Sequence, residues 1–272
     1  MPVARVNDID LYYEEHGEGP HLALIEGTGY HTWMWYRQLP ALTPQFRVLI
    51  YDNRGVGRSD KPPGPYSHEQ NADDLVGLLD FLGWDRTHVL GISMGGFIAQ
   101  EFALKYPGRL DALVLVATAF GGPHMAPVPA EAIRAMLPDP NLTPEERIRR
   151  GMRIAFSDPT WPEQHPEEFE QIVRWRLEYV PPPEAAAAQV MAGATFNTEQ
   201  RLGEVTAPTL IVAGDADRVV PARNAELLAE RIPAAELAIM PGGGHLAFID
   251  HADQFNQLVL NFLTRVDREA RV

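Results

Sequence analysis

The segment Gly91-Ile92-Ser93-Met94-Gly95 carries the side chain with the clearest capacity for chemistry in the chain. It fits the pattern G-x-S-x-G, and it joins an apolar run typical of a buried strand to a run typical of a helix. In that context the glycines permit a strained turn that exposes the serine hydroxyl, and the first N–H groups of the helix point toward whatever the hydroxyl attacks. This placement favours Ser93 as a nucleophile, although the pattern alone also occurs in structural turns.

A serine hydroxyl is a weak nucleophile near neutral pH and needs an adjacent base that is itself held by an acid. Among the nine histidines, His245 is the best candidate for the base, because it follows the last expected strand after three glycines that can bend its loop over the sheet edge. His88 opens the strand before Ser93 and is expected to be structural. Seven others lie in expected turns, on helix surfaces or in the central segment, where solvated or capping roles suffice: His16, His21, His31, His68, His124, His165 and His251.

Two aspartates, Asp215 and Asp217, are candidates for the acid, because both follow the apolar run 209–214. Asp217 stands just before a helix that begins with proline. Asp215 lies at the end of the strand, where a carboxylate can simply accept hydrogen bonds from loop amides. The local sequence leaves the choice between them open.

Apolar runs alternate with amphipathic runs along most of the chain, which predicts a mostly parallel sheet with helices on both faces. Ligands bind such sheets at the carboxyl ends of the strands, where Ser93, Asp217 and His245 all fall. After a hairpin of 3–6 with 9–15, strands are expected at 21–27, 46–52, 88–92, 110–118, 209–214 and 235–240, and helices at 31–42, 67–83, 94–106, 222–232 and 250–263. Residues 121–205 hold no strand-like run and are expected to form a helical insertion.

The composition restricts the classes of partner. With 23 Lys and Arg against 37 Asp and Glu, the formal net charge of −14 disfavours nucleic acid and anionic membrane surfaces. The chain has no cysteine, which excludes disulfides, thiolate metal sites and a cysteine nucleophile. No apolar run is long enough to span a bilayer and the N-terminus has no secretory pattern, so a cytoplasmic protein is expected. A homodimer is compatible with the sequence.

Four segments together resemble signatures of the α/β-hydrolase family, and the resemblance covers nearly the whole chain. They are YDNRGVGRSD at 51–60, the segment that starts with GISMGG at 91, APTLIVAGDADRVVP at 207–221 and PGGGHLAFID at 241–250. The combination is most similar to the branch of esterases, enol-lactonases and cofactor-free perhydrolases. It implies an α/β-hydrolase fold with a mostly parallel central sheet, a core domain at 1–120 and 206–272, and a helical cap at 121–205.

The resemblance also implies roles for particular residues. Ser93 would be the nucleophile, His245 the general base and then acid, and Asp217, in preference to Asp215, the group that orients the histidine. The backbone N–H groups of Thr28 and Met94 would form the oxyanion hole. No cofactor and no metal are needed for such a mechanism.

The sequence departs from the family pattern at Glu26-Gly27, where the family usually has His-Gly. A carboxylate there would disfavour a nearby oxyanion unless it is paired or turned away. Two interpretations stay open. In the first, Glu26 is buried and hydrogen-bonded to loop amides or to an arginine, for which Arg54 is the candidate. In the second, Glu26 contacts the substrate and contributes to its recognition. Asp52, Arg54 and Ser59 are expected to brace their loop rather than to do chemistry.

An apolar pocket is expected beneath the cap, with Trp33, Phe120 and Leu246 as candidate substrate-binding residues. The predicted substrate is a small, partly hydrophobic carboxylic ester or lactone. A C–C bond hydrolase or a perhydrolase with the same three residues, and a non-catalytic ligand-binding member of the fold, are the alternatives. Leu246 weighs against C–C hydrolases, which often have an aromatic residue after the catalytic histidine.

Overall fold

Eight strands form one sheet in the order β1-β2-β4-β3-β5-β6-β7-β8. The computed structural model describes residues 2–136, 139 and 141–270. The strands are β1 (Val3–Val6), β2 (Ile9–His16), β3 (His21–Ile25), β4 (Arg47–Tyr51), β5 (Thr87–Ile92), β6 (Leu110–Val116), β7 (Thr209–Gly214) and β8 (Glu236–Met240). The pairs β1–β2 and β2–β4 are antiparallel and the other five pairs are parallel. The predicted mostly parallel sheet is therefore confirmed.

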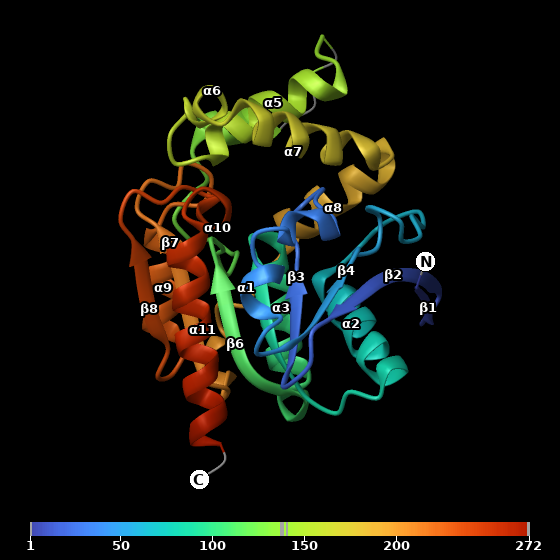
Figure 1. The fold of residues 1–272 in the computed structure, drawn as a ribbon, viewed down its shortest axis with the longest axis vertical. Coiled ribbons are helices and arrows are strands. Elements are labelled where there is room, and N and C mark those ends of the chain that lie inside the picture. The colour runs from blue at the N-terminus through green and yellow to red at the C-terminus, as the bar shows by residue number, and fades with distance from the viewer. Residues whose placement is uncertain (1, 137–138, 140, 271–272) are drawn as a thin grey trace.

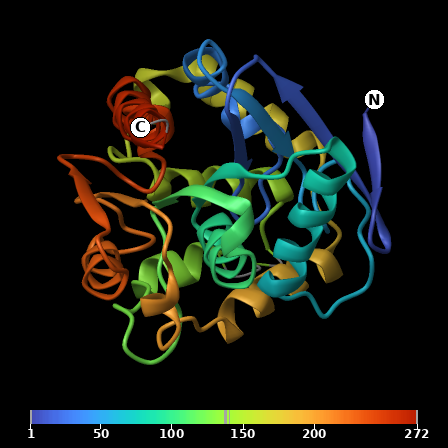
Figure 2. The same cartoon turned by 90° about the horizontal axis from the view of Figure 1, so that it is seen from below.

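The central strands are apolar on both faces because helices cover both. Along β3, Leu22 and Leu24 belong to one buried cluster while Ala23 and Ile25 belong to the other, as the two-residue repeat of a strand requires. The first cluster packs against α1 (Leu39–Leu42) and α11 (Ala252–Glu269), and the second against α2 (His68–Leu82), α3 (Met94–Lys105) and α9 (Arg223–Arg231). These two helical layers lie on opposite sides of the sheet (Figure 2).

Helix α2 illustrates how local sequence fixes the element boundaries. The Ser67 side chain accepts the N–H of Gln70 at the start of the helix, and Gly83 ends it with φ 70°, in the left-handed region that glycine adopts readily. The predicted helix at 31–42 is wrong in detail, because the structure has two short pieces, η1 (Thr32–Trp35) and α1. Pro40 stands at the second position of α1, where its missing N–H costs nothing, so the second piece begins there.

The segment between β6 and β7 is helical, as predicted. It contains α4 (Ala130–Met136), α5 (Pro144–Ala155), α6 (Trp161–Gln164), α7 (Pro166–Glu178), α8 (Pro183–Thr195) and η3 (Leu202–Glu204). We call α4 to α8 the helical insert. Figure 1 shows α5, α6 and α7 across the end of the sheet toward which the β3 and β6 arrows point. The insert has its own aromatic packing, in which the rings of Phe156 and Trp161 stack at 4.2 Å.

Two short helices complete the chain, η2 (Pro107–Arg109) after α3 and α10 (Ala247–Asp250) before α11. The backbone N–H of Leu246, just before α10, donates to the carbonyl of Ala155 at the end of α5 with a length of 2.9 Å. The N–H and hydroxyl of Ser157 both donate to Asp250 Oδ2, at 2.8 and 2.6 Å. The insert is thus hydrogen-bonded to the segment that follows β8.

His68 is buried, which contradicts the expectation of a solvated or capping role. It lies at the first position of α2, 3% exposed, with its ring 5.3 Å from the rings of both Phe97 and Phe196. Neither ring nitrogen has a hydrogen-bond partner in the described part of the chain. Burial lowers the pKa of His68 to about 4, so the ring is neutral in the folded protein at neutral pH.

His68 should make the protein sensitive to acid. Between pH 6.5, its ordinary pKa, and about 4, its pKa when folded, the unfolded state binds a proton that the folded state does not, so stability is full above this window and is lost as the pH falls through it. The total loss is about 3 kcal/mol. The free energy of unfolding in urea should fall across this window by about 3 kcal/mol less in His68→Phe than in wild type. The matched control is His165→Phe at an exposed position, and parallel curves for His68→Phe and wild type would refute this assignment.

Candidate active site

Ser93 occupies a strained corner between β5 and α3. Its backbone has φ 55° and ψ −118°, a conformation that costs a residue with a side chain about 1–3 kcal/mol. Hydrogen bonds hold the corner: the Ser93 N–H donates to the Val116 carbonyl at 2.9 Å, and the Ser93 carbonyl accepts the Gly96 N–H at 2.9 Å and the Thr118 hydroxyl at 2.7 Å. This is the geometry that places a serine side chain at the end of a strand and clear of both elements.

The glycines on either side of Ser93 are required by close backbone approach. A Cβ on Gly91 would lie 2.1 Å from the carbonyl oxygen of Gly95, and a Cβ on Gly95 would lie 2.2 Å from the carbonyl oxygen of Ile25. Both distances are far inside van der Waals contact. The glycines therefore let α3 start directly against the ends of β3 and β5.

The structure brings His245 to Asp217 rather than to Asp215. His245 Nδ1 lies 2.9 Å from Asp217 Oδ2, and Asp217 Oδ1 accepts the N–H groups of Val219 and Val220 at 2.7 and 2.8 Å. Asp215 instead accepts the Gly242 N–H at 2.7 Å. Because a carboxylate only accepts hydrogen bonds, Nδ1 carries the proton and Nε2 is the basic nitrogen.

The loop after β3, residues 27–31, passes beside the serine; we call it the oxyanion loop, after the role expected of Thr28. A Cβ on Gly27 would lie 3.4 Å from Ser93 Cβ and 3.9 Å from Ser93 Oγ. The N–H groups of Thr28 and Met94 donate to no other group within residues 2–136, 139 and 141–270. Backbone N–H groups without a partner beside a nucleophile are able to stabilise a developing oxyanion.

Glu26 is turned toward one amide of the loop after β4. It is fully buried, its Oε1 accepts the Asn53 N–H at 2.7 Å, and its Oε2 has no partner among the described residues. Burial, and after it the charge of Asp52, raise the pKa of Glu26 well above its usual range. A neutral acid at this position does not oppose negative charge at the oxyanion loop.

Arg54 is not the partner of Glu26, so that expectation is wrong. Its guanidinium makes two hydrogen bonds to Asp74 on α2, at 2.6 and 2.8 Å, and both side chains are 2% exposed. A buried guanidinium prefers such two-point contact with an ionised carboxylate. Arg54 therefore braces its loop against α2, as expected of it.

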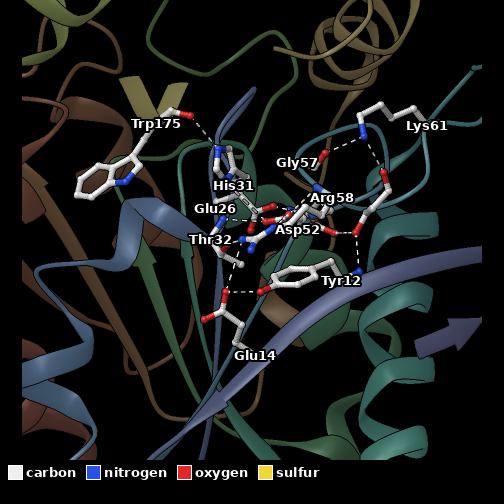
Figure 3. Close-up of polar contacts among 12 residues, drawn as sticks. Tyr12, Glu14, Glu26, His31, Thr32, Asp52, Gly57, Arg58, Lys61 and Trp175 are labelled. Carbon is white, nitrogen blue, oxygen red and sulfur yellow. Dashed lines mark hydrogen bonds and ion pairs between the residues drawn. The ribbon is translucent and has the colours of Figure 1, made fainter. Parts of the chain in front are cut away.

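Asp52 ties the oxyanion loop region to the loop after β4 (Figure 3). Its Oδ1 accepts the Thr32 N–H at 2.8 Å and its Oδ2 accepts the Arg58 N–H at 2.7 Å. The Arg58 guanidinium donates to Thr32 Oγ1 at 2.5 Å and lies 3.5 Å from the ring centroid of Tyr12. Ser59 donates its hydroxyl to the Asp52 carbonyl at 2.5 Å. The bracing roles expected of Asp52 and Ser59 are confirmed.

His31 is buried rather than solvated, and sequence reasoning missed its contacts. It is 4% exposed, and its Nε2 lies 3.1 Å from the carbonyl oxygen of Trp175 in α7 (Figure 3). Burial lowers the pKa of His31 against the attraction of Asp52, whose Oδ1 is 4.0 Å from Nδ1. A carbonyl only accepts, so Nε2 carries the ring proton. The sequence signal for these contacts was the position of His31, three residues beyond the expected oxyanion donor Thr28.

The three expected substrate-binding residues have different environments. Trp33, 9% exposed, lines a cavity of about 270 Å³ together with Trp175 of the insert, its stacking partner at 5.6 Å. Leu246 is 2% exposed and belongs to the buried cluster that includes the insert. Phe120 is fully buried in the other cluster, with the Arg231 guanidinium 4.7 Å from its ring centroid. Neither Ser93 nor His245 lines the cavity beside Trp33.

Within the described ranges, no group of three or more His, Asp or Glu side chains is placed to hold a metal ion. No helix in the same ranges is long and apolar enough to cross a bilayer.

Comparison with known proteins gives a consistent family. A family model for the alpha/beta hydrolase fold matches residues 20–252. The chain is 31% identical to "Putative carbamate hydrolase RutD" of Azorhizobium caulinodans, over 98% of this chain and 100% of that protein. It is 32% identical to 2-hydroxy-6-oxononadienedioate/2-hydroxy-6-oxononatrienedioate hydrolase 1 of Dechloromonas aromatica, over 94% and 91% of the two chains. The crystal structure of the enol-lactonase from Burkholderia xenovorans LB400 is similar with a TM-score of 0.85 and 27% identity, covering 97% and 100%.

The neutral state of Glu26 predicts a stability effect of Glu26→Gln. The folded protein keeps a proton on Glu26 that the unfolded chain releases, so the stability due to this group is full below its ordinary pKa and declines as the pH rises toward its folded pKa, by at most about 1.4 kcal/mol per pH unit. The free energy of unfolding, measured in urea, should therefore increase for Glu26→Gln relative to wild type as the pH rises from about 5 to about 8. The exposed Glu131 offers a matched control, Glu131→Gln. A constant difference across this range would show that Glu26 is ionised when folded.

Proposed function

Because the chain belongs to the alpha/beta hydrolase fold family, we propose that it is a serine hydrolase that cleaves a carboxylic ester or lactone through an acyl-enzyme on Ser93. The substrate is small and partly hydrophobic. The observation that carries the proposal is the hydrogen bond of 2.9 Å between His245 Nδ1 and the buried carboxylate of Asp217, which leaves a basic Nε2 in the loop after β8. A histidine held in this tautomer is what activation of a serine requires.

The proposed reaction has two steps. Ser93 Oγ attacks the carbonyl carbon while His245 Nε2 takes the hydroxyl proton, and the carbonyl oxygen becomes an oxyanion bound by the Thr28 and Met94 N–H groups. The oxyanion collapses, the C–O bond to the alcohol breaks, and His245 returns the proton to the leaving oxygen. Water then attacks the acyl-enzyme in the same way, which releases the acid and restores Ser93.

Residues 121–205, which include the helical insert, are proposed as a cap domain over this site, on a core domain at 1–120 and 206–272. Its hydrogen bonds to Leu246 and Asp250, next to His245 in the chain, support this position. Trp33 and Leu246, both buried near the insert, remain the proposed apolar contacts for substrate. Phe120 is proposed with them, although it is enclosed in the core and would act by shaping the floor of the pocket.

Hydrolysis of a C–C bond is the second candidate, because one observation favours it. A Cβ built on Gly29 would lie 3.8 Å from the Arg176 guanidinium of α7. The same guanidinium lies 4.2 Å from the ring centroid of Tyr30, so a cation faces the oxyanion loop. The relative from Dechloromonas aromatica is named for a dioate, a substrate with two carboxylates. A guanidinium here would suit a substrate that carries a carboxylate in addition to its reacting carbonyl.

Replacing the nucleophile should abolish ester hydrolysis. We expect Ser93→Ala to lower kcat/KM for p-nitrophenyl acetate and butyrate on the order of 10⁴-fold or more, because no acyl-enzyme can form. The matched control is Ser67→Ala, which removes a hydroxyl that only caps α2. It should keep the wild-type rate per folded molecule. Equal rates for Ser93→Ala and wild type would remove the proposal.

A substrate panel separates the candidate reactions in the wild-type protein. Acid production from open-chain esters and lactones fits the broad proposal, and acid from lactones alone narrows it to a lactonase. Cleavage of a vinylogous 1,5-diketone that carries a carboxylate, with esters inert, would favour the C–C hydrolase instead.

A further inference from the structure

Two hydrogen bonds join the helical insert to the oxyanion loop. The Gly29 N–H donates to Gln189 Oε1 of α8 at 3.1 Å, and His31 Nε2–H donates to the Trp175 carbonyl of α7 at 3.1 Å. The two contacts are two residues apart in the loop and come from different helices. Between β3 and His31, the loop is thus held by the insert as well as by its own Tyr30 N–H bond to Gly27.

Gln189 is a polar residue in an otherwise apolar helix face. The buried positions of α8 are Ala185, Ala188, Gln189 and Ala192, the spacing of a single helical stripe. Burying an amide without hydrogen bonds costs free energy, so the buried Gln189 side chain needs hydrogen-bond partners. Gln189 is 2% exposed, and its Nε2 lies 3.5 Å from the Arg54 carbonyl while its Oε1 takes the Gly29 N–H. One side chain therefore bridges the loops that follow β3 and β4.

His31 satisfies a carbonyl that α7 leaves free. Trp175 lies in the last turn of α7, and the final four carbonyls of a helix have no partner within it. The His31 ring packs edge-on to the Tyr179 ring, with centroids 5.3 Å apart and planes at 87°. The next residue, Thr32, is fixed by its N–H bond to Asp52. The contact thus joins the end of α7 to a part of the core that is itself held.

We propose that Gln189 and His31 are positioning residues that hold the oxyanion loop in its catalytic geometry, so that the Thr28 N–H is correctly aimed only while α7 and α8 rest on the core. This inference rests on the proposed function, since it assigns the insert a part in stabilising the oxyanion. Gln189 fixes the peptide that follows Thr28, and His31 fixes the end of the loop. Movement of the insert would release both contacts together.

The expected effect is on the chemical step. Loss of one oxyanion donor lowers kcat by about 10²–10³-fold, and a donor displaced by about 1 Å loses a large part of that contribution. A contact that aims the donor should therefore be worth less than the donor itself, about 10-fold to 100-fold in kcat. The KM for a substrate as small as p-nitrophenyl acetate should change little, because the proposed substrate contacts Trp33, Leu246 and Phe120 lie in the core and are not substituted.

The first test compares Gln189→Met, which keeps the length of the side chain without its amide, with the control Val190→Met at the adjacent exposed position. We expect Gln189→Met to lower kcat at least about 10-fold with nearly unchanged KM, and Val190→Met to behave as wild type. Amide hydrogen exchange of a peptide spanning residues 27–31 should be faster in Gln189→Met only. An unchanged kcat in a folded Gln189→Met protein overturns the proposal, whether or not exchange changes.

The second test uses His31 and remains decisive if Gln189→Met does not fold. His31→Phe keeps a ring but has no donor for the Trp175 carbonyl, whereas His31→Gln keeps a side-chain N–H. We expect kcat to fall in His31→Phe and to recover substantially in His31→Gln. Because both positions hold one loop, the double variant Gln189→Met/His31→Phe should lose less than the product of the single losses. Equal kcat in His31→Phe and wild type, or a double loss equal to the product, contradicts a shared role.

Failure of this inference is distinct from failure of the proposed function. If wild type hydrolyses no ester or lactone, the proposed function is wrong, and the exchange data would then report only how the insert holds the loop. If wild type is active and the variants keep its kcat, the function stands and the positioning role is wrong.

Discussion

The close approach of α3 to the ends of β3 and β5 is the constraint on which the site depends. It is allowed only because Gly91 and Gly95 lack side chains, and it forces Ser93 into a backbone conformation that residues with a Cβ rarely adopt. The same approach brings Gly27 against Ser93 and leaves the Met94 N–H at the free start of a helix. One backbone arrangement thus sets the positions of the proposed nucleophile, Ser93, and of the proposed oxyanion donors together.

Two buried ionised groups near this corner, Asp52 and Arg54, are each held by several hydrogen bonds. Asp52 is occupied by the N–H groups of Thr32 and Arg58, and Arg54 by Asp74. Glu26 feels the charge of Asp52 and has no cationic partner in the described part of the chain, and burial keeps it neutral. The departure of Glu26 from the usual histidine of the family is therefore compatible with oxyanion binding, because the side chain is turned to the Asn53 amide.

The sequence predicted what depends on local patterns. Helix α2 follows from the helical periodicity of residues 67–83, the strands from their apolar runs, and Ser93 from the spacing of its glycines. Features that depend on distant contacts were not predictable: the burial of His31 and His68, the pairing of Arg54 with Asp74 and the choice of Asp217 without a family resemblance. Gln189 could have been noticed as the one polar side chain on the buried face of an alanine-rich helix, but its partner lies 160 residues away.

In the proposed mechanism, the corner and the His245–Asp217 pair together make the Ser93 hydroxyl reactive. Labelling with a fluorophosphonate, followed by mass spectrometry of intact and digested protein, tests this most directly, because the reagent reacts with activated serines and needs no knowledge of the natural substrate. We expect a single adduct on Ser93 in wild type and a far slower reaction in His245→Ala. An adduct elsewhere, or equal labelling of Ser93 in both proteins, would contradict it.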